Sequence, residues 1–305
     1  MKAKYKGILF IILSALCFAF MNMFVRLSGD LPSIQKSFFR NLIAFCIALA
    51  ALIRSGERFR VKEGNRKYMI LRAGFGTIGI LCNFYAVDHL VLSDASMLNK
   101  MSPFFVILFS FLILKEKLTP IQVTAICGAF AGSLLIIKPT FLNMNILPSL
   151  IGLCGGLCAG IAYTMVRILG QRGQKGTMVV LFFSGFSCLI TLPYLIFSYE
   201  PMSAAQVLFL LGAGLAAAGG QFAITAAYYH APAREISVYD YSQIIFSALI
   251  GYVVFLQVPD RWSVAGYVII IAMAVWMFFY NQHHETASAG SENKTADGTG
   301  KSGRS

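Results

Sequence analysis

Two charged side chains lie inside long apolar runs of the chain, and they are the residues best placed to do chemistry. Lys100 lies in the run 93–114, three residues before Pro103, and Asp240 lies in the run 236–257. A charge is costly in hydrocarbon and normally faces a protein interior or a watery cavity. A proline leaves the carbonyl one turn earlier without its amide donor, which a membrane tolerates only where protein or water covers it. Paired charges of this kind usually mark the path of a solute or a proton.

The residues around Lys100 share one side of a predicted helix, because their spacing is i, i+3, i+4 and i+7. They are Ser96, Asn99, Lys100 and Pro103. The residues 141 positions later are Ser237, Asp240, Tyr241 and Ile244. We therefore predict that one half of the chain supplies a buried cation and the other a buried carboxylate at a matching depth. The alternative is a purely structural ion pair that locks the helices together.

The offset of 141 positions relates the two halves of the chain in several other places. The matches in this register are Val25-Arg26 with Val166-Arg167, Leu16-Cys17 with Leu157-Cys158, Gly79 with Gly220, His89 with His230, Ser96 with Ser237, and Phe105 with Phe246. We interpret residues 7–137 and 147–281 as two copies of one unit, preceded by a short N-terminus, 1–6. The tail 282–305 is polar and lacks apolar periodicity, so we expect it to be disordered.

The apolar runs predict an all-α integral membrane protein. Hydrophobic residues make up 57% of the chain and charged residues only 12%, and the mean hydropathy is +0.71; soluble domains carry about 25% charged residues. A helix needs about 20 apolar residues to cross a bilayer. The run 7–27 is too long for the core of a signal peptide, so we interpret it as a retained first span. Further spans are predicted at 33–53, 68–87, 93–114, 119–137, 147–169, 177–198, 205–229, 236–257 and 262–281, which makes ten transmembrane helices, five in each repeat.

The positions of Lys and Arg predict the orientation of these spans, because short cytoplasmic loops are enriched in both. Basic residues gather at the N-terminus, in the loops near 54–67, 115–117 and 172–175, and at Arg234, while the alternate loops carry few. Both termini are therefore expected in the cytoplasm, and the protein itself is expected in the cytoplasmic membrane. An odd number of spans per repeat makes the two repeats inverted. The net charge of +12 then reflects membrane orientation and not nucleic-acid binding.

Other polar residues within the spans are expected to line the same space as Lys100. Arg40 breaks the pattern of basic loops, and we predict it at the outer mouth of a cavity; snorkelling to the outer headgroups is the alternative. Asn83, Tyr163 and Gln221, together with Asn99 and Tyr241, complete the predicted binding residues. The glycines at 152, 156 and 160 suit close helix packing inside the bundle or a dimer interface.

Several other classes of chemistry are not expected. The seven cysteines and four histidines have no metal-ligand spacing, so no metal site is predicted. The chain also lacks a Walker-type phosphate loop and a nucleophile–base pattern. We therefore expect no cofactor and no enzymatic activity.

The stretch Leu98-Asn99-Lys100-Met101-Ser102-Pro103, followed by the apolar run 111–114 and Lys115-Glu116, resembles the fourth span of the EamA-type branch of the drug/metabolite transporter superfamily. In that family a proline precedes an apolar run that ends in Gly-Glu. Lys115 replaces the glycine here, while in the second half Ile244 replaces the proline and Gln257-Val258 stands where the acidic residue is expected. The resemblance covers about residues 7–281. It implies a basket of helices around a central cavity, with spans five and ten at the periphery.

Together these observations predict a secondary transporter, not driven by ATP, that moves a small amphipathic organic solute by alternating access. The solute is expected to be amino-acid-like or another metabolite. The alternatives are an uptake permease for a vitamin- or nucleoside-like metabolite, or a membrane scaffold without transport activity. The expected partners are the solute and the lipid bilayer, in a monomer or homodimer.

Overall fold

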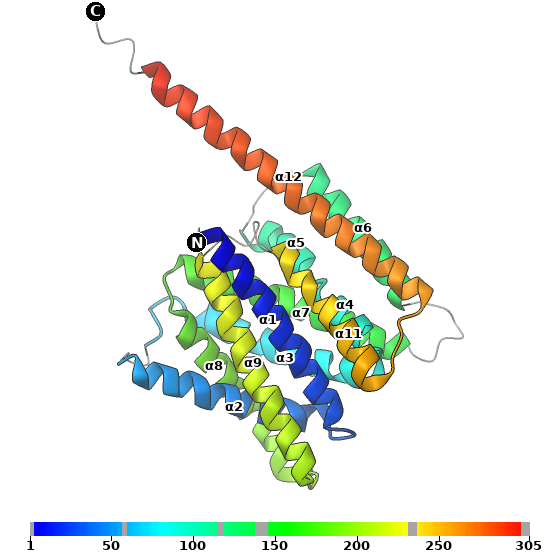
Figure 1. Cartoon of the computed structure of the whole chain (residues 1–305). Coiled ribbons are helices and arrows are strands. Elements are labelled where there is room, and N and C mark those ends of the chain that lie inside the picture. Colours follow the sequence, from blue (N-terminus) through cyan, green and yellow to red (C-terminus); the bar gives the residue numbers. More distant parts are fainter. Residues whose placement is uncertain (1–2, 57–59, 115–118, 138–145, 231–236, 300–305) are drawn as a thin grey trace, which may run out of the picture.

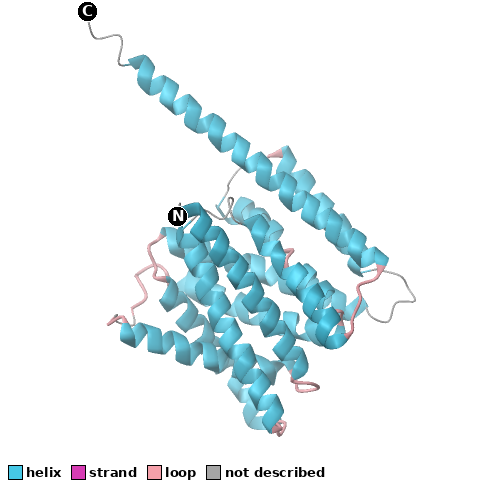
Figure 2. Ribbon diagram, viewed as in Figure 1, coloured by secondary structure: helices cyan, strands magenta, loops and turns pink. Residues whose placement is uncertain are grey.

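The computed structural model describes residues 3–56, 60–114, 119–137, 146–230 and 237–299, and every regular element in them is a helix (Figure 2). In chain order the helices are α1 (Ala3–Leu27), α2 (Ser33–Arg54), α3 (Arg66–His89), α4 (Leu92–Asn99), α5 (Ser102–Leu114), α6 (Pro120–Ile137), α7 (Ile146–Gln171), α8 (Gly176–Ser198), α9 (Ala204–His230), the 3₁₀ helix η1 (Ser237–Tyr241), α11 (Ser242–Phe255) and α12 (Arg261–Thr299).

Eight of the described helices are long and apolar enough to cross a membrane. The other two predicted spans are each built from two shorter helices: α4 with α5 forms the fourth span, and η1 with α11 forms the ninth. The boundaries of the predicted spans agree with the helix bounds to within a few residues, except that α12 continues to Thr299, beyond the predicted end at 281. The prediction of an all-α membrane protein with ten spans is therefore confirmed, with the added feature that spans four and nine are broken.

The second half of the structure repeats the first, helix for helix, as the offset predicted. One contact shows the symmetry directly: the Ser14 hydroxyl donates to the carbonyl of Gly220 at 2.9 Å. The equivalent of Ser14 in the second repeat is Gly155, and the equivalent of Gly220 in the first repeat is Gly79. These two residues are also close together, because a Cβ added to Gly79 would lie only 3.3 Å from the carbonyl oxygen of Gly155. The α1–α9 and α3–α7 packings are thus images of one another.

The equivalent helices α6 and α12 run antiparallel, which shows that the repeats are inverted. Gly128 faces Met273, whereas further along α6 Gly132 faces Ile270 and Ile136 faces Gly266. The two helices pack side by side at one edge of the molecule (Figure 1). The prediction that spans five and ten are peripheral is therefore confirmed.

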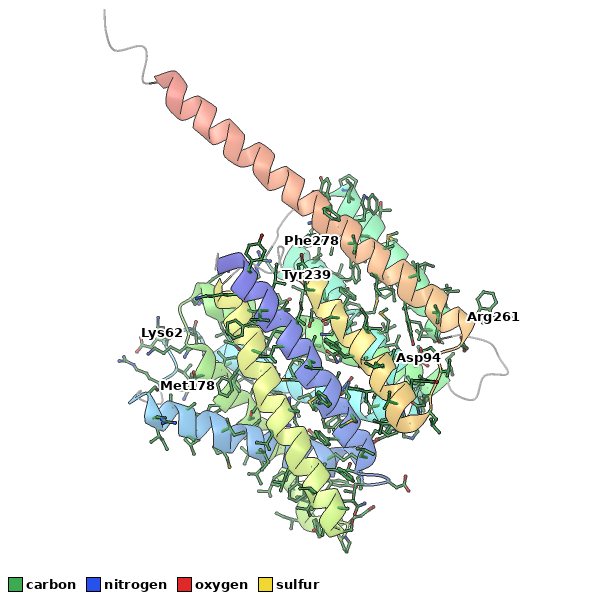
Figure 3. All side chains as sticks on the ribbon, in the orientation of Figure 1. Lys62, Asp94, Met178, Tyr239, Arg261 and Phe278 are labelled. Atoms are coloured by element: carbon green, nitrogen blue, oxygen red, sulfur yellow. The ribbon has the colours of Figure 1, made fainter. Side chains whose placement is uncertain are left out.

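Two of the loops predicted to share one side of the membrane, near 54–67 and 172–175, lie at the same end of the bundle. The Gln174 side chain accepts from the Lys62 amide at 3.1 Å and donates to the Arg60 carbonyl at 3.3 Å. Figure 3 shows Lys62 far from Asp94, which follows α3 at the opposite end of the molecule. The side of the membrane on which each end lies stays a prediction.

Charged and polar residues are buried inside the bundle, while apolar residues both fill its core and cover much of its outer surface. Lys36 and Arg40 are 0% and 1% exposed, whereas Leu208 and Val268 are 66% and 62% exposed. Lipid, unlike water, does not drive apolar side chains inward, so packing and polar contacts hold the helices together.

The expected domain bounds stay a proposal: an N-terminus at 1–6, repeats at 7–137 and 147–281, and a disordered tail at 282–305. Helix α1 already begins at Ala3, and α12 continues to Thr299. The end of α12 projects away from the other described helices (Figure 1). Lys115 and Glu116 of the stretch that resembles the EamA-type family, and Arg234, lie outside the described residues.

Candidate functional site

The fourth span breaks at Lys100, beside the residues expected to carry function. Helix α4 ends at Asn99 and α5 begins at Ser102. The Lys100 amide still donates to the Ser96 carbonyl at 3.0 Å, but the Met101 amide donates to Leu98, only three residues back, at 3.2 Å. Of the four residues predicted to share one helical face, Ser96, Asn99 and Lys100 follow each other along α4 and its end, whereas Pro103 belongs to the next helix, α5. The physical reason is that Pro103 has no amide hydrogen to continue the α-helical ladder and suits the first turn of a new helix.

The glycines of α7 cover this break. A Cβ on Gly156 would lie 2.5 Å from the Leu98 carbonyl oxygen, and one on Gly160 would lie 2.4 Å from the Cβ of Phe105 and 3.1 Å from the Ser102 carbonyl. Only glycine allows the irregular backbone to approach so closely. Because this face of α7 already packs against spans of the same chain, its glycines serve packing inside the bundle and not a dimer interface.

The two predicted charges meet across the breaks of spans four and nine. The Lys100 ammonium donates to a carboxylate oxygen of Asp240 at 2.6 Å, and the two residues are 5% and 7% exposed. The second carboxylate oxygen of Asp240 has no hydrogen-bond partner among the described residues. One lone pair of a buried carboxylate is thus left for another donor.

A polar cavity adjoins Lys100 between the two repeats, with about 70 Å³ of space for water-sized molecules. Its lining includes six of the eight predicted binding residues: Arg40, Asn83, Asn99, Lys100, Tyr163 and Gln221. A site for one water needs about 10–15 Å³, so the cavity accommodates several waters or a small polar group. Drug-sized ligands occupy about 300–1,000 Å³, and a solute of that size requires the helices to move apart.

Two of the predicted residues do not line the cavity. Asp240 contributes through its bond to Lys100. Tyr241 is 4% exposed and packs in an apolar cluster with Phe105 and Ile244, where its hydroxyl has no described partner. The offset places Tyr241 opposite Lys100 in sequence, but it closes the 3₁₀ turn η1 and so faces another direction.

Arg40 lies deeper than the outer mouth that we predicted. It is 1% exposed and lines the cavity, seven residues or about 10 Å of helix after the start of α2. Burial also excludes snorkelling to the headgroups. The reason is that α2 packs against α8 and α9 within the bundle, so its inward face is covered.

Sequence reasoning missed two further lining residues, Arg72 and Gln243. Arg72 is a charge inside the predicted span 68–87, the same signal that singled out Arg40. It lies under the ring of Phe183, with its guanidinium carbon 4.3 Å from the ring centroid. Gln243 is likewise a polar residue inside an apolar run, and it is 3% exposed.

A chain of hydrogen bonds ties the cavity wall to both repeats. The Asn83 amide donates to Asn22 at 3.1 Å, and Ser96 donates to Ser247 at 2.8 Å, with Asn22 within 3.5 Å of Ser96. These residues belong to α3, α1, α4 and α11. The network therefore couples the wall of the cavity to both broken spans.

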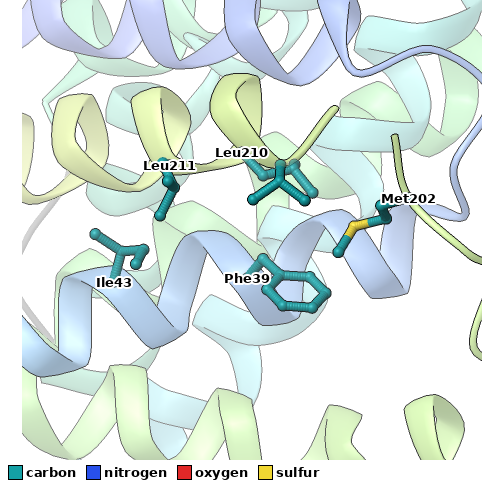
Figure 4. Close-up of a pocket in the computed structure, with 6 residues that line it drawn as sticks. Phe39, Ile43, Met202, Leu210 and Leu211 are labelled. Atoms are coloured by element: carbon teal, nitrogen blue, oxygen red, sulfur yellow. The ribbon is translucent and has the colours of Figure 1, made fainter. Parts of the chain in front are cut away.

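A smaller cavity of about 20 Å³ lies between α2 and α9 (Figure 4). Its lining is apolar and consists of Phe39, Ile43, Met202, Val207, Leu210 and Leu211. These side chains supply shape but no group that orients a polar solute, so the cavity beside Lys100 is the candidate site.

Comparison with known proteins agrees with this architecture. Residues 5–138 match the EamA-like transporter family. The chain is 29% identical to the pseudopaline exporter of Pseudomonas aeruginosa over 88% of its own length and 94% of the exporter, and 26% identical to the riboflavin transporter of Brucella anthropi over 85% and 94%. A solved crystal structure with 17% identity shares the fold, with a TM-score of 0.65 over 92% of this chain and 98% of that one. The first half of the chain thus matches the EamA-like transporter family, and similarity to named transporters over most of the chain supports a multi-pass membrane transporter.

Proposed function

We propose that this protein is a secondary transporter of a small zwitterionic or anionic organic solute, amino-acid-like in its charges. The observation that carries the proposal is the 2.6 Å pair of Lys100 and Asp240, which joins the broken spans of the two repeats beside a polar cavity. Broken helices and midplane charges are the usual materials of a transport site. A solute carboxylate would pair with Lys100, while Asp240 would hold an amine or a proton.

Burial of the site supports alternating access. Arg40, Arg72, Lys100 and Asp240 are each at most 7% exposed, so a solute reaches them only after helices separate. In a pair of inverted repeats, the opening on one side has a symmetry-related counterpart on the other. The symmetric packings α1–α9 and α3–α7 are where the two repeats would rock.

Uptake of a vitamin-like metabolite is the second candidate, because one relative is named a riboflavin transporter. Another relative is named an exporter, so similarity alone does not set a direction. A large ring system would need a cavity several times the one observed. The charges at Lys100 and Asp240 favour a zwitterion. They also argue against a scaffold, which has no use for buried charges.

Paired substitutions at Lys100 and Asp240 test the proposal. Removing one member of a buried pair leaves the other uncompensated, at a cost of about 3–5 kcal/mol, so Lys100→Met and Asp240→Asn should each lower the amount of folded protein. The double variant should regain abundance but not transport, measured in sealed vesicles as uptake and efflux of a metabolite library. Normal transport by the double variant would reduce the pair to a structural lock.

The ion pair of buried Lys36 with partly buried Asp88, 2.7 Å apart at the end of α3, provides the control. Neither residue lines the cavity. The double variant Lys36→Met with Asp88→Asn should retain both abundance and transport. A transport loss equal to that of the Lys100 and Asp240 variant would show that any buried pair is needed.

A further inference from the structure

We propose that Arg40 and Arg72 form a second anion subsite in the cavity, and that the solute is an amino-acid-like compound with an additional carboxylate or phosphate. This deepens the proposed function, but the binding experiment below does not depend on transport. The two arginines come from different helices, α2 and α3, and both line the cavity beside Lys100.

Both guanidinium groups are buried, and neither has an acidic partner in the part of the chain that the structure describes. Arg40 is 1% exposed and Arg72 is 5% exposed, and the Nε atom of each has no hydrogen-bond partner among the described residues. The described carboxylates form no ion pair with either arginine, whereas those of Asp88 and Asp240 pair with lysines. Buried charges are normally paired. Two arginines that share a cavity without a counterion therefore indicate that an anion completes the site.

The bundle positions Arg40 through a second layer of polar contacts. Its guanidinium donates to the Asn41 side-chain oxygen. The Asn41 amide in turn donates to Ser187 of α8 at 2.8 Å and to Ser37 at 3.2 Å. With one nitrogen held by Asn41, the remaining donors of the planar guanidinium are available to an oxyanion.

Among the described residues, Arg72 is held by the shape of its surroundings and by no hydrogen bond. A Cβ on Gly76 would lie 2.2 Å from an Arg72 nitrogen and 2.8 Å from the Phe183 ring, so glycine makes the space for the guanidinium. Phe183 supports one face of the cation. Stacking leaves the edge of the guanidinium, which carries its hydrogen-bond donors, open to a ligand. Tyr163 also lines the cavity.

The charges in the cavity define the class of solute. Arg40, Arg72 and Lys100 are cationic, and Asp240 compensates Lys100 alone. A simple amino acid would match Lys100 and Asp240 but leave both arginines uncompensated. One further oxyanion placed between the arginines supplies the missing negative charge: a phosphate dianion balances both arginines and a carboxylate balances one, and guanidinium groups bind either group in a two-pronged geometry.

Thermal unfolding of the purified full-length protein tests the subsite, with malonate and inorganic phosphate as probes and sodium chloride at matched ionic strength as reference. We expect a saturable rise in unfolding temperature with malonate, phosphate or both, and the larger response identifies the preferred group. Arg40→Gln and Arg72→Gln should each weaken the affinity by at least about tenfold, which corresponds to about 1.4 kcal/mol. Arg54→Gln on α2 and Arg66→Gln on α3 change exposed arginines of the same helices and should leave the affinity unchanged.

Three results would overturn the proposal: no response beyond that of chloride, an unchanged affinity in both cavity variants, or a loss of affinity only in Lys100→Met. If the Gln variants do not fold, Arg40→Lys and Arg72→Lys keep the charge and lose the two-pronged donor geometry, so they should still bind more weakly; equal affinity counts against the subsite. A normal transport rate in the Lys100 and Asp240 double variant would overturn the proposed function and leave the malonate result standing.

Discussion

The closeness of α7 to the break in span four makes Gly156→Ala a stringent test of how the site is built. The added Cβ would lie 2.5 Å from the Leu98 carbonyl oxygen, and ordinary contacts begin at 3.4 Å. The backbone at the break must therefore retreat by about 0.9 Å. It has few ways to do so, because the neighbouring atoms are main chain and not the end of a flexible side chain.

The expected cost follows from this displacement. Overpacking a buried site typically costs about 1–3 kcal/mol, and each kcal/mol lowers the unfolding temperature of a large domain by about 2–4 °C. Leu98 lies two residues before Lys100, so the same movement disturbs the position of the ammonium relative to Asp240. Displacements of about 1 Å can cost about 100-fold in rate where geometry is critical. We expect transport to fall by at least about tenfold even in the folded fraction.

The measurement combines unfolding temperature in detergent with transport per folded molecule in proteoliposomes. Gly170→Ala is the control, because it lies on the same helix with no neighbouring atom within 4 Å of the added Cβ. Alanine favours a helix over glycine by about 0.5–1 kcal/mol, so this variant should be neutral or slightly more stable. If Gly156→Ala behaves like Gly170→Ala, α7 does not hold the break, and the reasoning is wrong.

Three other predictions concern the frame around the site. Cysteine labelling should reach positions 62 and 175 from one side of the membrane and position 88 from the other; labelling Lys62 and Lys175 from opposite sides would contradict the inverted repeats. Lys36→Met should lower the unfolding temperature, because it leaves Asp88 without its lysine partner at a cost of about 3–5 kcal/mol. Adding Asp88→Asn should restore most of the lost unfolding temperature. If the two losses are additive instead, the two residues are not coupled. Tyr267→Phe removes the hydroxyl of α12 that donates a hydrogen bond to the buried carboxylate of Asp94 in α4. The loss should lower the free energy of unfolding by about 1–3 kcal/mol. An unfolding temperature equal to that of the parent would show that this hydrogen bond does not hold α12 in place.

Much of the architecture was predictable because it depends on properties that run along the chain. The length of each apolar run sets the spans, and the register of the repeat sets the symmetry. Lys100 and Asp240 could be paired in advance for the same reason, since buried charges of opposite sign on symmetry-related helices compensate one another at least cost. Asn99 and Asn83 were found because a polar side chain in an apolar span needs a polar surrounding.

Tertiary structure decided which way the other side chains face. Tyr241 is the sequence equivalent of Lys100, but it ends a 3₁₀ turn, which advances the chain differently from an α-helix, and it points into an apolar cluster. Tyr239, two residues earlier, packs edge-on against Phe278 of α12, with ring centroids 6.2 Å apart (Figure 3).

The position of the arginines also depends on packing. Arg40 was expected at the outer mouth and Arg72 was not singled out, although both lie in apolar runs. Their placement in one cavity requires α2 and α3 to be rotated toward each other by their contacts with α8 and α7. Hydrophobic periodicity carries little information about such a rotation in lipid, where apolar residues occupy both the interior and the surface. Only the assembled bundle brings two charges from separate helices to the same enclosed space.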